Sequence, residues 1–153
     1  MPRATRRRTI AAPVDRVWEL VSDPYSLPRW WPRTSRVESV ERTPEGRGSQ
    51  WTKVLETAEG RGVRADYRCI DSASGERYAW EQQVGGSPFE RHLRSSVVEI
   101  RLRPADNGAE VCLRSEQRLR GMSRLGSPMM RGGQGKTLEQ ALDGIEAALE
   151  GPA

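Results

Sequence analysis

The chain has 153 residues and carries 25 lysines and arginines against 21 acidic residues, which gives a net charge of +4. This length allows one hydrophobic core, so we expect a single domain over residues 1–153. No apolar run reaches the length of a membrane span, and the N-terminus lacks the apolar core of a signal peptide, which indicates a cytoplasmic protein without stable membrane insertion.

The basic residues are almost all arginines, and they alternate with apolar residues along the chain. We interpret them as a solvated outer face rather than a nucleic-acid groove, because no aromatic residues interleave with a basic cluster. Cys69, Cys112 and His92 share no metal-ligand spacing. We therefore expect no nucleic acid, no metal, no cofactor and two reduced cysteines. His92 is expected at the surface or at a rim, not as a catalytic base.

The first part of the chain predicts one strand and two short helices. Ala4–Ile10 can form a strand, and a short helix then opens at Pro13 or Val14. The apolar face of this helix consists of Val14, Val17, Trp18 and Val21. A second helical piece, Tyr25–Trp31, closes at Pro32. Helices this short are not stable alone, so we expect both to pack against a larger element.

The middle of the chain reads as six strands separated by clusters of turn residues. The predicted strands are Ser35–Arg42, Ser49–Thr57, Gly62–Asp71, Glu76–Val84, Glu90–Arg103 and Ala109–Arg120. Several of the turns have hairpin length, which favours antiparallel pairing of consecutive strands.

A long C-terminal helix is predicted from Ser127, its N-cap, to Glu150, before a Gly-Pro stop. Its apolar stripe recurs at steps of four, three and four, in Leu138, Leu142, Ile145 and Leu149. The acidic residues expected to face outward are Glu139, Asp143, Glu146 and Glu150. The element order therefore predicts an α+β fold, a curved antiparallel seven-stranded sheet with this helix on its concave face.

The first half of this helix is rich in flexible and small residues. They are Met129, Met130, Gly132, Gly133 and Gly135. Each interior glycine costs about 1 kcal/mol of helix stability relative to alanine. One interpretation is a kink or a frayed first turn. The other is that small side chains leave space for a ligand between helix and sheet.

Several segments resemble a known superfamily. They are residues 10–24 (IAAPVDRVWELVSDP), 27–32 (LPRWWP), 67–71 (YRCID), 76–80 (ERYAW) and 116–121 (EQRLRG). The chain resembles the START-like, or helix-grip, superfamily, and more narrowly the bacterial polyketide cyclase/dehydrase and lipid-transport proteins (SRPBCC). The resemblance covers nearly the whole chain. It implies a deep apolar cavity between sheet and C-terminal helix in a family that includes aromatase/cyclases and lipid carriers.

Strand parity predicts the wall of this cavity, because alternate side chains of a strand face opposite ways. Trp80 shares a face with Gln82, and Ser115 shares one with Gln117. Ile100 and Leu102 set the phase of the sixth strand, which places Val98, Ser96 and Arg94 inside. The predicted ligand-binding residues are Trp51, Tyr67, Trp80, Gln82, Arg94, Ser96, Val98, Ser115, Gln117, Met129 and Gly133.

These observations favour a protein that binds a hydrophobic or amphipathic small molecule, lipid-like or polyketide-like, as a monomer or homodimer. No residue is marked as catalytic, so binding is favoured over catalysis. A polyketide cyclase or aromatase is the alternative, with Tyr67 or Arg94 polarising a carbonyl. An interaction protein using a basic face against an acidic partner or ribosomal RNA is a further alternative. A filled core without a cavity would exclude both ligand hypotheses.

Overall fold

The computed structural model of the protein describes residues 3–56, 62–91, 93–119 and 127–150. The strands are β1 (Arg3–Ile10), β2 (Thr34–Glu41), β3 (Gln50–Glu56), β4 (Gly62–Ala73), β5 (Arg77–Gln82), β6 (Leu93–Ala105) and β7 (Gly108–Leu119). The helices are α1 (Val14–Val21), α2 (Leu27–Trp30) and α3 (Ser127–Glu150), and two 3-10 turns are η1 (Pro24–Ser26) and η2 (Pro88–Arg91).

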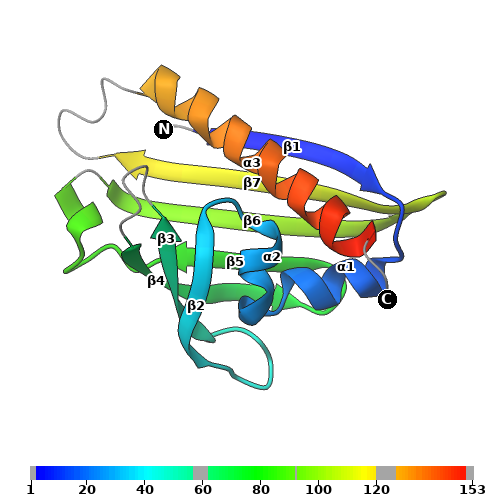
Figure 1. The fold of residues 1–153 in the computed structure, drawn as a ribbon, viewed down its shortest axis with the longest axis horizontal. Coiled ribbons are helices and arrows are strands. Elements are labelled where there is room, and N and C mark those ends of the chain that lie inside the picture. Colours follow the sequence, from blue (N-terminus) through cyan, green and yellow to red (C-terminus); the bar gives the residue numbers. More distant parts are fainter. Residues whose placement is uncertain (1–2, 57–61, 92, 120–126, 151–153) are drawn as a thin grey trace.

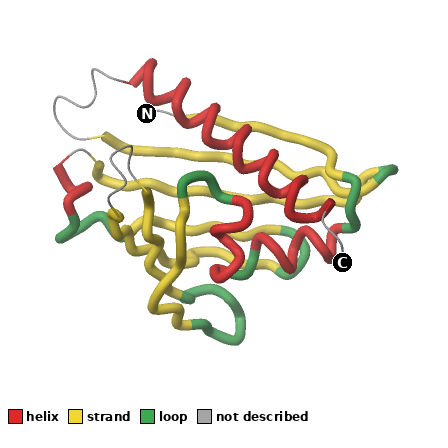
Figure 2. The backbone as a smooth tube through the Cα atoms, viewed as in Figure 1, coloured by secondary structure: helices red, strands yellow, loops and turns green. Residues whose placement is uncertain are grey.

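The strands form one antiparallel seven-stranded sheet in the order β1-β7-β6-β5-β4-β3-β2. The first strand therefore pairs with the last, and β2 to β7 follow one another as neighbours (Figure 1). The register shifts within the β2–β3, β4–β5 and β6–β7 pairs. Such irregularities bend the strands, and the curved sheet holds the helices on one side (Figure 2). The predicted α+β helix-grip fold is confirmed.

Two element boundaries differ from the prediction. The predicted second helix divides into η1 and α2, because the Asp23 carboxylate accepts a hydrogen bond from Tyr25 N at 3.0 Å and opens a separate turn. The predicted strand from Glu90 begins only at Leu93. The Ser87 hydroxyl accepts a hydrogen bond from Phe89 N at 3.3 Å, which stabilises η2 before the strand.

Helix α3 buries the predicted apolar stripe against the sheet and the short helices. Leu138, Leu142 and Ile145 are completely buried, and Leu149 is half-buried. They belong to one core cluster with Val17 of α1 and residues of the central strands. In the described part of the chain, no helix combines the length and the hydropathy needed to cross a membrane.

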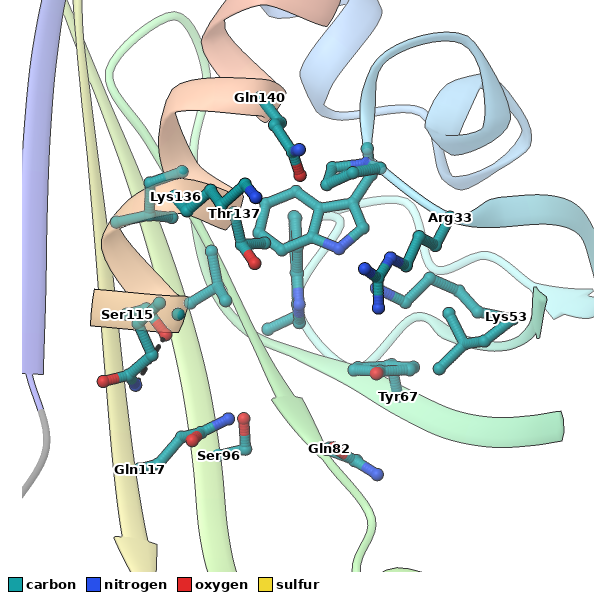
Figure 3. Close-up of a pocket in the computed structure, with 18 of the residues that line it drawn as sticks. Arg33, Lys53, Tyr67, Gln82, Ser96, Ser115, Gln117, Lys136, Thr137 and Gln140 are labelled. Carbon is teal, nitrogen blue, oxygen red and sulfur yellow. Dashed lines mark hydrogen bonds between the residues drawn. The ribbon is translucent and has the colours of Figure 1, made fainter. Parts of the chain in front are cut away.

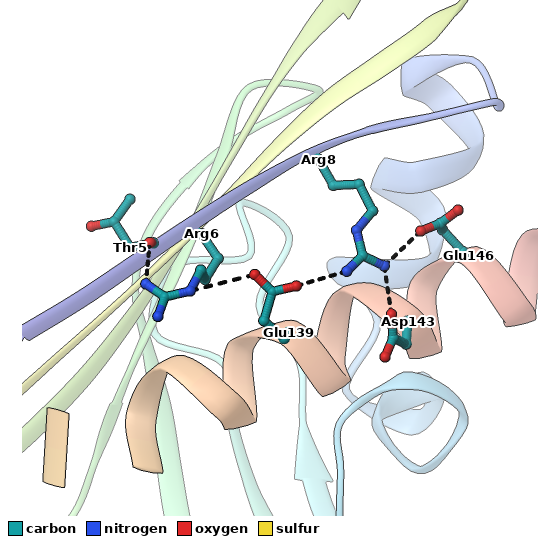
Figure 4. A network of polar contacts seen from close by, with 6 residues as sticks. All are labelled: Thr5, Arg6, Arg8, Glu139, Asp143 and Glu146. Carbon is teal, nitrogen blue, oxygen red and sulfur yellow. Dashed lines mark hydrogen bonds and ion pairs between the residues drawn. The ribbon is translucent and has the colours of Figure 1, made fainter. Parts of the chain in front are cut away.

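Three acidic residues of α3, Glu139, Asp143 and Glu146, lie beside β1 and keep contact with solvent while they pair with a strand arginine (Figure 4). Arg8 Nη1 donates to Asp143 Oδ1 and to Glu146 Oε1, each at 2.6 Å. Arg8 Nη2 donates to Glu139 Oε2 at 2.8 Å. One strand arginine therefore joins three carboxylates on successive turns of α3, while Glu150 stays exposed. Sequence periodicity could not show this, because the partner is 131 residues away along the chain.

Candidate functional site

A cavity of about 740 Å³ lies between the sheet and α3 (Figure 3). The sheet contributes Lys53, Leu55, Glu56, Val63, Tyr67, Trp80, Gln82, Ser96, Val98, Ser115 and Gln117. The other lining residues are Trp31, Pro32, Arg33, Phe89, Gly133, Gln134, Lys136, Thr137, Leu138 and Gln140. This volume falls within the range of about 300–1,000 Å³ that small-molecule sites occupy.

One end of the cavity is an aromatic cage, formed by Trp31, Tyr67 and Trp80 around the side chain of Lys53. The Lys53 Nζ atom lies 4.2 Å from the centre of the Tyr67 ring, 4.9 Å from that of Trp31 and 5.5 Å from that of Trp80. Trp31 and Trp80 meet edge to face with ring centroids 5.3 Å apart. The cage therefore holds an amine between ring faces, where a cation is attracted by the π electrons.

Lys53 is only 2% exposed, although it carries an ionisable amine. Burial lowers the pKa of Lys53 to about 7, because the charged form loses its hydration. No ion pair within the described residues includes Lys53. The neutral amine is therefore much more accessible at neutral pH than it is for a lysine in water.

The other end of the cavity carries neutral hydrogen-bonding groups. Gln134 Nε2 of α3 donates to Ser115 Oγ of β7 at 3.2 Å, and this buried bond ties the helix to the sheet. Gln82 Nε2 and Gln117 Oε1 are buried and have no hydrogen-bond partner among the described residues. A buried amide atom without a partner costs about 1–3 kcal/mol. These two atoms are therefore available to an acceptor and a donor of a bound molecule.

The rim of the cavity is charged. Arg33, Glu56 and Lys136 line the cavity and are exposed. The backbone of Arg33 has a φ of 60°, in the left-handed region that residues other than glycine rarely adopt. Strain of this kind tends to occur at functional sites. The rim therefore combines charge with a constrained turn directly after α2.

A family model described as polyketide cyclase / dehydrase and lipid transport matches residues 1–150. The chain belongs to this family. No match is found among curated protein sequences.

Solved structures with the same fold include a START superfamily protein from Mycobacterium smegmatis, with a TM-score of 0.79, 18% identity and 97% of each chain covered. The di-domain ARO/CYC StfQ from the steffimycin biosynthetic pathway gives a TM-score of 0.78 and 13% identity, over 95% of this chain and 50% of StfQ. A protein from Arthrobacter aurescens gives a TM-score of 0.72 and 20% identity, over 97% and 86% of the two chains. At these identities the likeness concerns the fold.

In this member of the polyketide cyclase/dehydrase and lipid transport family, most of the predicted ligand-binding residues gather at the cavity. Those that line it are Tyr67, Trp80, Gln82, Ser96, Val98, Ser115, Gln117 and Gly133. Strand parity worked here because β5 and β7 alternate regularly and Ser96 lies opposite Gln117. The structure brings these residues together, and their role in binding stays a prediction.

Two predicted residues do not line the cavity. Arg94 is exposed, because the register shift between Leu93 and Ser95 adds one residue to β6 and reverses the parity beyond it. Leu93 takes the inward position instead. Trp51 packs in the core behind the cavity wall, where its ring stacks on Tyr67 with centroids 6.3 Å apart and planes at 11°.

Two further predictions lie outside what the structure describes. The side chain of Met129 and the residue His92 are not among the described parts of the chain. In the described part, no group of three or more histidine, cysteine or carboxylate side chains is arranged to bind a metal ion. Cys69 and Cys112 carry free thiols.

Sequence reasoning missed Lys53 and Trp31. Lys53 follows Trp51 by two positions on β3, so the parity that turns Trp51 inward also turns Lys53 inward. The prediction treated charged residues as solvent-facing, and for this reason the inward parity of Lys53 was overlooked. Trp31 was predicted only as the last residue of the second helical piece, and not as part of the cavity. It follows the last residue of α2 in an extended conformation, and its ring meets both Trp30 and Trp80 edge to face, with centroids 5.5 Å and 5.3 Å apart.

The glycines of α3 serve different purposes. A Cβ at Gly133 would meet nothing within 4 Å, and Gly133 lines the cavity. A Cβ at Gly135 would instead meet the guanidinium group of Arg6. Gly133 therefore leaves space at the cavity, whereas Gly135 makes room for an arginine of β1.

Proposed function

We propose that this chain binds a hydrophobic or amphipathic small molecule, lipid-like or polyketide-like, in the cavity between the sheet and α3. The observation that carries this proposal is the cavity of about 740 Å³, together with the unpartnered amide atoms of Gln82 and Gln117 beside it. A core filled by its own side chains would leave no such volume. Membership of a family named for polyketide cyclases and lipid transport supports the same ligand class.

Binding would follow from the contrast between the two ends of the cavity. The aromatic cage and the apolar wall of Leu55 and Val98 take the apolar body of the ligand, which displaces loosely held water. Gln82 Nε2 donates to a ligand acceptor, and Gln117 Oε1 accepts from a ligand donor. A molecule with an apolar body and polar oxygens matches both the apolar wall and the two amide groups.

A cyclase or aromatase is the second candidate, and the protonation state of Tyr67 supports it. Burial raises the pKa of the Tyr67 hydroxyl, so this group stays protonated at neutral pH and can donate a hydrogen bond to a carbonyl oxygen. The cavity would then contribute by folding a reactive chain and excluding water. Arg94, the other residue considered for this role, is exposed and stands apart from the lining.

The third hypothesis, an interaction protein with a free basic face, receives less support. Many arginines of the outer sheet surface form ion pairs with neighbouring acids. Examples are Arg77–Asp71 at 2.6 Å, Arg101–Glu99 at 2.7 Å and Arg103–Glu110 at 2.9 Å. Paired charges of this kind attract a polyanion less than unpaired ones do.

The experiment that tests the proposal is a titration with N-phenyl-1-naphthylamine, an apolar dye whose fluorescence rises in a nonpolar site. We expect the parent protein to bind the dye and Gly133→Leu to lose at least tenfold in affinity. A Cβ at position 133 meets nothing within 4 Å, and Gly133 lines the cavity, so a leucine there should take up space that the dye needs. Its melting temperature should be unchanged or higher, because leucine forms helices better than glycine.

The matched control is Gly85→Leu. A Cβ at Gly85 also meets nothing within 4 Å, and Gly85 does not line the cavity. This variant should bind the dye as the parent does. Equal dye binding by the parent and Gly133→Leu, or no binding by the folded parent, would exclude the proposed function.

A further inference from the structure

We propose that Lys53 is a nucleophilic amine that forms a reversible imine with the aldehyde or ketone carbonyl of a molecule held in the cavity. This inference rests on the proposed function, because the carbonyl compound must first occupy the cavity. It adds a covalent step and narrows the ligand class to carbonyl compounds.

The aromatic cage positions the amine. Three rings surround Nζ at centroid distances of 4.2 to 5.5 Å, and the side chain is 2% exposed while still contributing to the cavity wall. The packed rings restrict the rotamers of a side chain that is flexible at a surface. Since the rings enclose Lys53 and its side chain borders the cavity, a carbonyl compound can approach the nitrogen only from the cavity side.

The same burial makes the amine reactive. A lysine attacks a carbonyl only in its neutral form, and desolvation in an apolar pocket is an established way to obtain that form. Burial lowers the pKa of Lys53 to about 7. An ordinary lysine, with a pKa of about 10.4, carries only about one neutral amine per thousand at pH 7.4.

The reaction balances without any further reagent. The lone pair of Nζ attacks the carbonyl carbon, a C–N bond forms, and the carbonyl oxygen gains a proton to give a carbinolamine. The hydroxyl group then leaves as water as the nitrogen loses its second hydrogen, and a C=N bond remains. The two hydrogens of the neutral amine therefore depart with the carbonyl oxygen. Water reverses the reaction, so the bond holds the ligand without consuming it.

Neighbouring groups favour this chemistry. The Tyr67 hydroxyl lies on the same wall; burial raises its pKa, so it keeps its proton and can donate a hydrogen bond to the carbonyl oxygen. Gln82 is paired with Tyr67 across β4 and β5, and its Nε2 has no partner among the described residues. We therefore infer an amphipathic ligand with one carbonyl near Lys53 and a second oxygen within reach of Gln82.

The sequence supplies an internal reference for a labelling experiment, because Lys53 and Lys136 are its only lysines. Both line the cavity, but Lys136 is exposed at the rim. The parent protein is incubated with 2-naphthaldehyde and sodium cyanoborohydride, which reduces an imine to a stable secondary amine. Peptide mass spectrometry then measures the labelling rate at each lysine from pH 5.5 to 9.

We expect Lys53 to be labelled at least tenfold faster than Lys136 at pH 7.4, with a rate that levels off above about pH 7. An excess of N-phenyl-1-naphthylamine, which has no carbonyl, should protect Lys53. The imine proposal would be overturned if Lys53 were labelled no faster than Lys136. It would also be overturned if the competitor left the labelling of Lys53 unchanged.

The dye titration separates this failure from failure of the proposed function. If the parent protein binds N-phenyl-1-naphthylamine but is not labelled at Lys53, the proposed function stands and the imine proposal is excluded. If the folded parent protein binds neither compound, both proposals are excluded. Because every measurement uses the parent protein, none depends on a variant that might misfold.

Discussion

Gly144 of α3 lies directly against the backbone of Trp30 in α2. A Cβ at position 144 would stand 2.7 Å from Trp30 Cα, nearer than real Cβ atoms approach, and would meet the Trp30 carbonyl group as well. Trp30 precedes Trp31, which covers Lys53 in the aromatic cage. The contact between two helices therefore sets the position of one wall of the cavity.

Gly144→Ala should destabilise the protein by about 1–3 kcal/mol, because an added methyl group forces two backbones apart. This loss should appear although alanine is the better helix former by about 1 kcal/mol. The matched control is Gly133→Ala in the same helix, where a Cβ meets nothing within 4 Å. In urea denaturation, the control should be at least as stable as the parent, and Gly144→Ala should have a lower free energy of unfolding than the parent. Equal stability of the two variants would contradict the close approach.

Arg8→Met should lower the free energy of unfolding by about 1–2 kcal/mol at low salt. The methionine keeps part of the packing, but it leaves Glu139, Asp143 and Glu146 on one face of α3 without their shared partner. Salt screens the repulsion among these carboxylates, so the loss should shrink in 1 M sodium chloride. Arg7→Met, at the neighbouring exposed position, is the control and should change stability little at either salt concentration.

Leu142→Ala should cost about 2–5 kcal/mol, because Leu142 is completely buried in the core cluster beneath α3. Glu150→Ala, at an exposed position of the same helix, should change the stability by less than about 0.5 kcal/mol. Chemical denaturation of both variants gives the comparison. A Leu142→Ala protein as stable as Glu150→Ala would mean that a different face of α3 meets the sheet.

The sequence predicted the order of strands and helices because its signals there are local. Turn residues separate the strands, and the Leu138–Leu142–Ile145 spacing marks the buried face of α3. Parity along regular strands then placed Gln82 and Gln117 at the cavity. The family model confirms the predicted family, and the structure confirms the predicted fold. The single domain, the cytoplasmic location, the oligomeric state and the ligand stay predictions.

Prediction failed where the deciding interaction is not local. The bulge that turns Arg94 outward depends on how β6 pairs with β7, which the β6 sequence alone does not reveal. The partners of Arg8 lie at the opposite end of the chain. Lys53 was missed for a different reason: it shares the parity of Trp51 on β3, but the general rule that charged residues face water speaks against an inward lysine.

The pH dependence of stability should reveal the buried Lys53. In the folded protein its pKa is about 7, whereas an unfolded lysine has a pKa of about 10.4. Between these values the unfolded chain binds one more proton than the folded one, so the stability of the parent should rise with pH from about 7 to about 10. Below pH 7 the amine is charged in both states, and the full cost of burying it remains.

Lys53→Met removes this cost, so it should melt at a higher temperature than the parent at pH 6–7. The advantage should shrink steadily as the pH rises from about 7 to about 10, because over this range the folded parent carries a neutral amine. Thermal unfolding of both proteins in steps of one pH unit measures the difference. Lys136→Met, at an exposed position, is the control and should give a difference that does not change with pH. A Lys53→Met advantage that stays constant from pH 6 to 10 would mean that Lys53 keeps its charge in the folded protein, and that the aromatic cage binds an ammonium group rather than an amine.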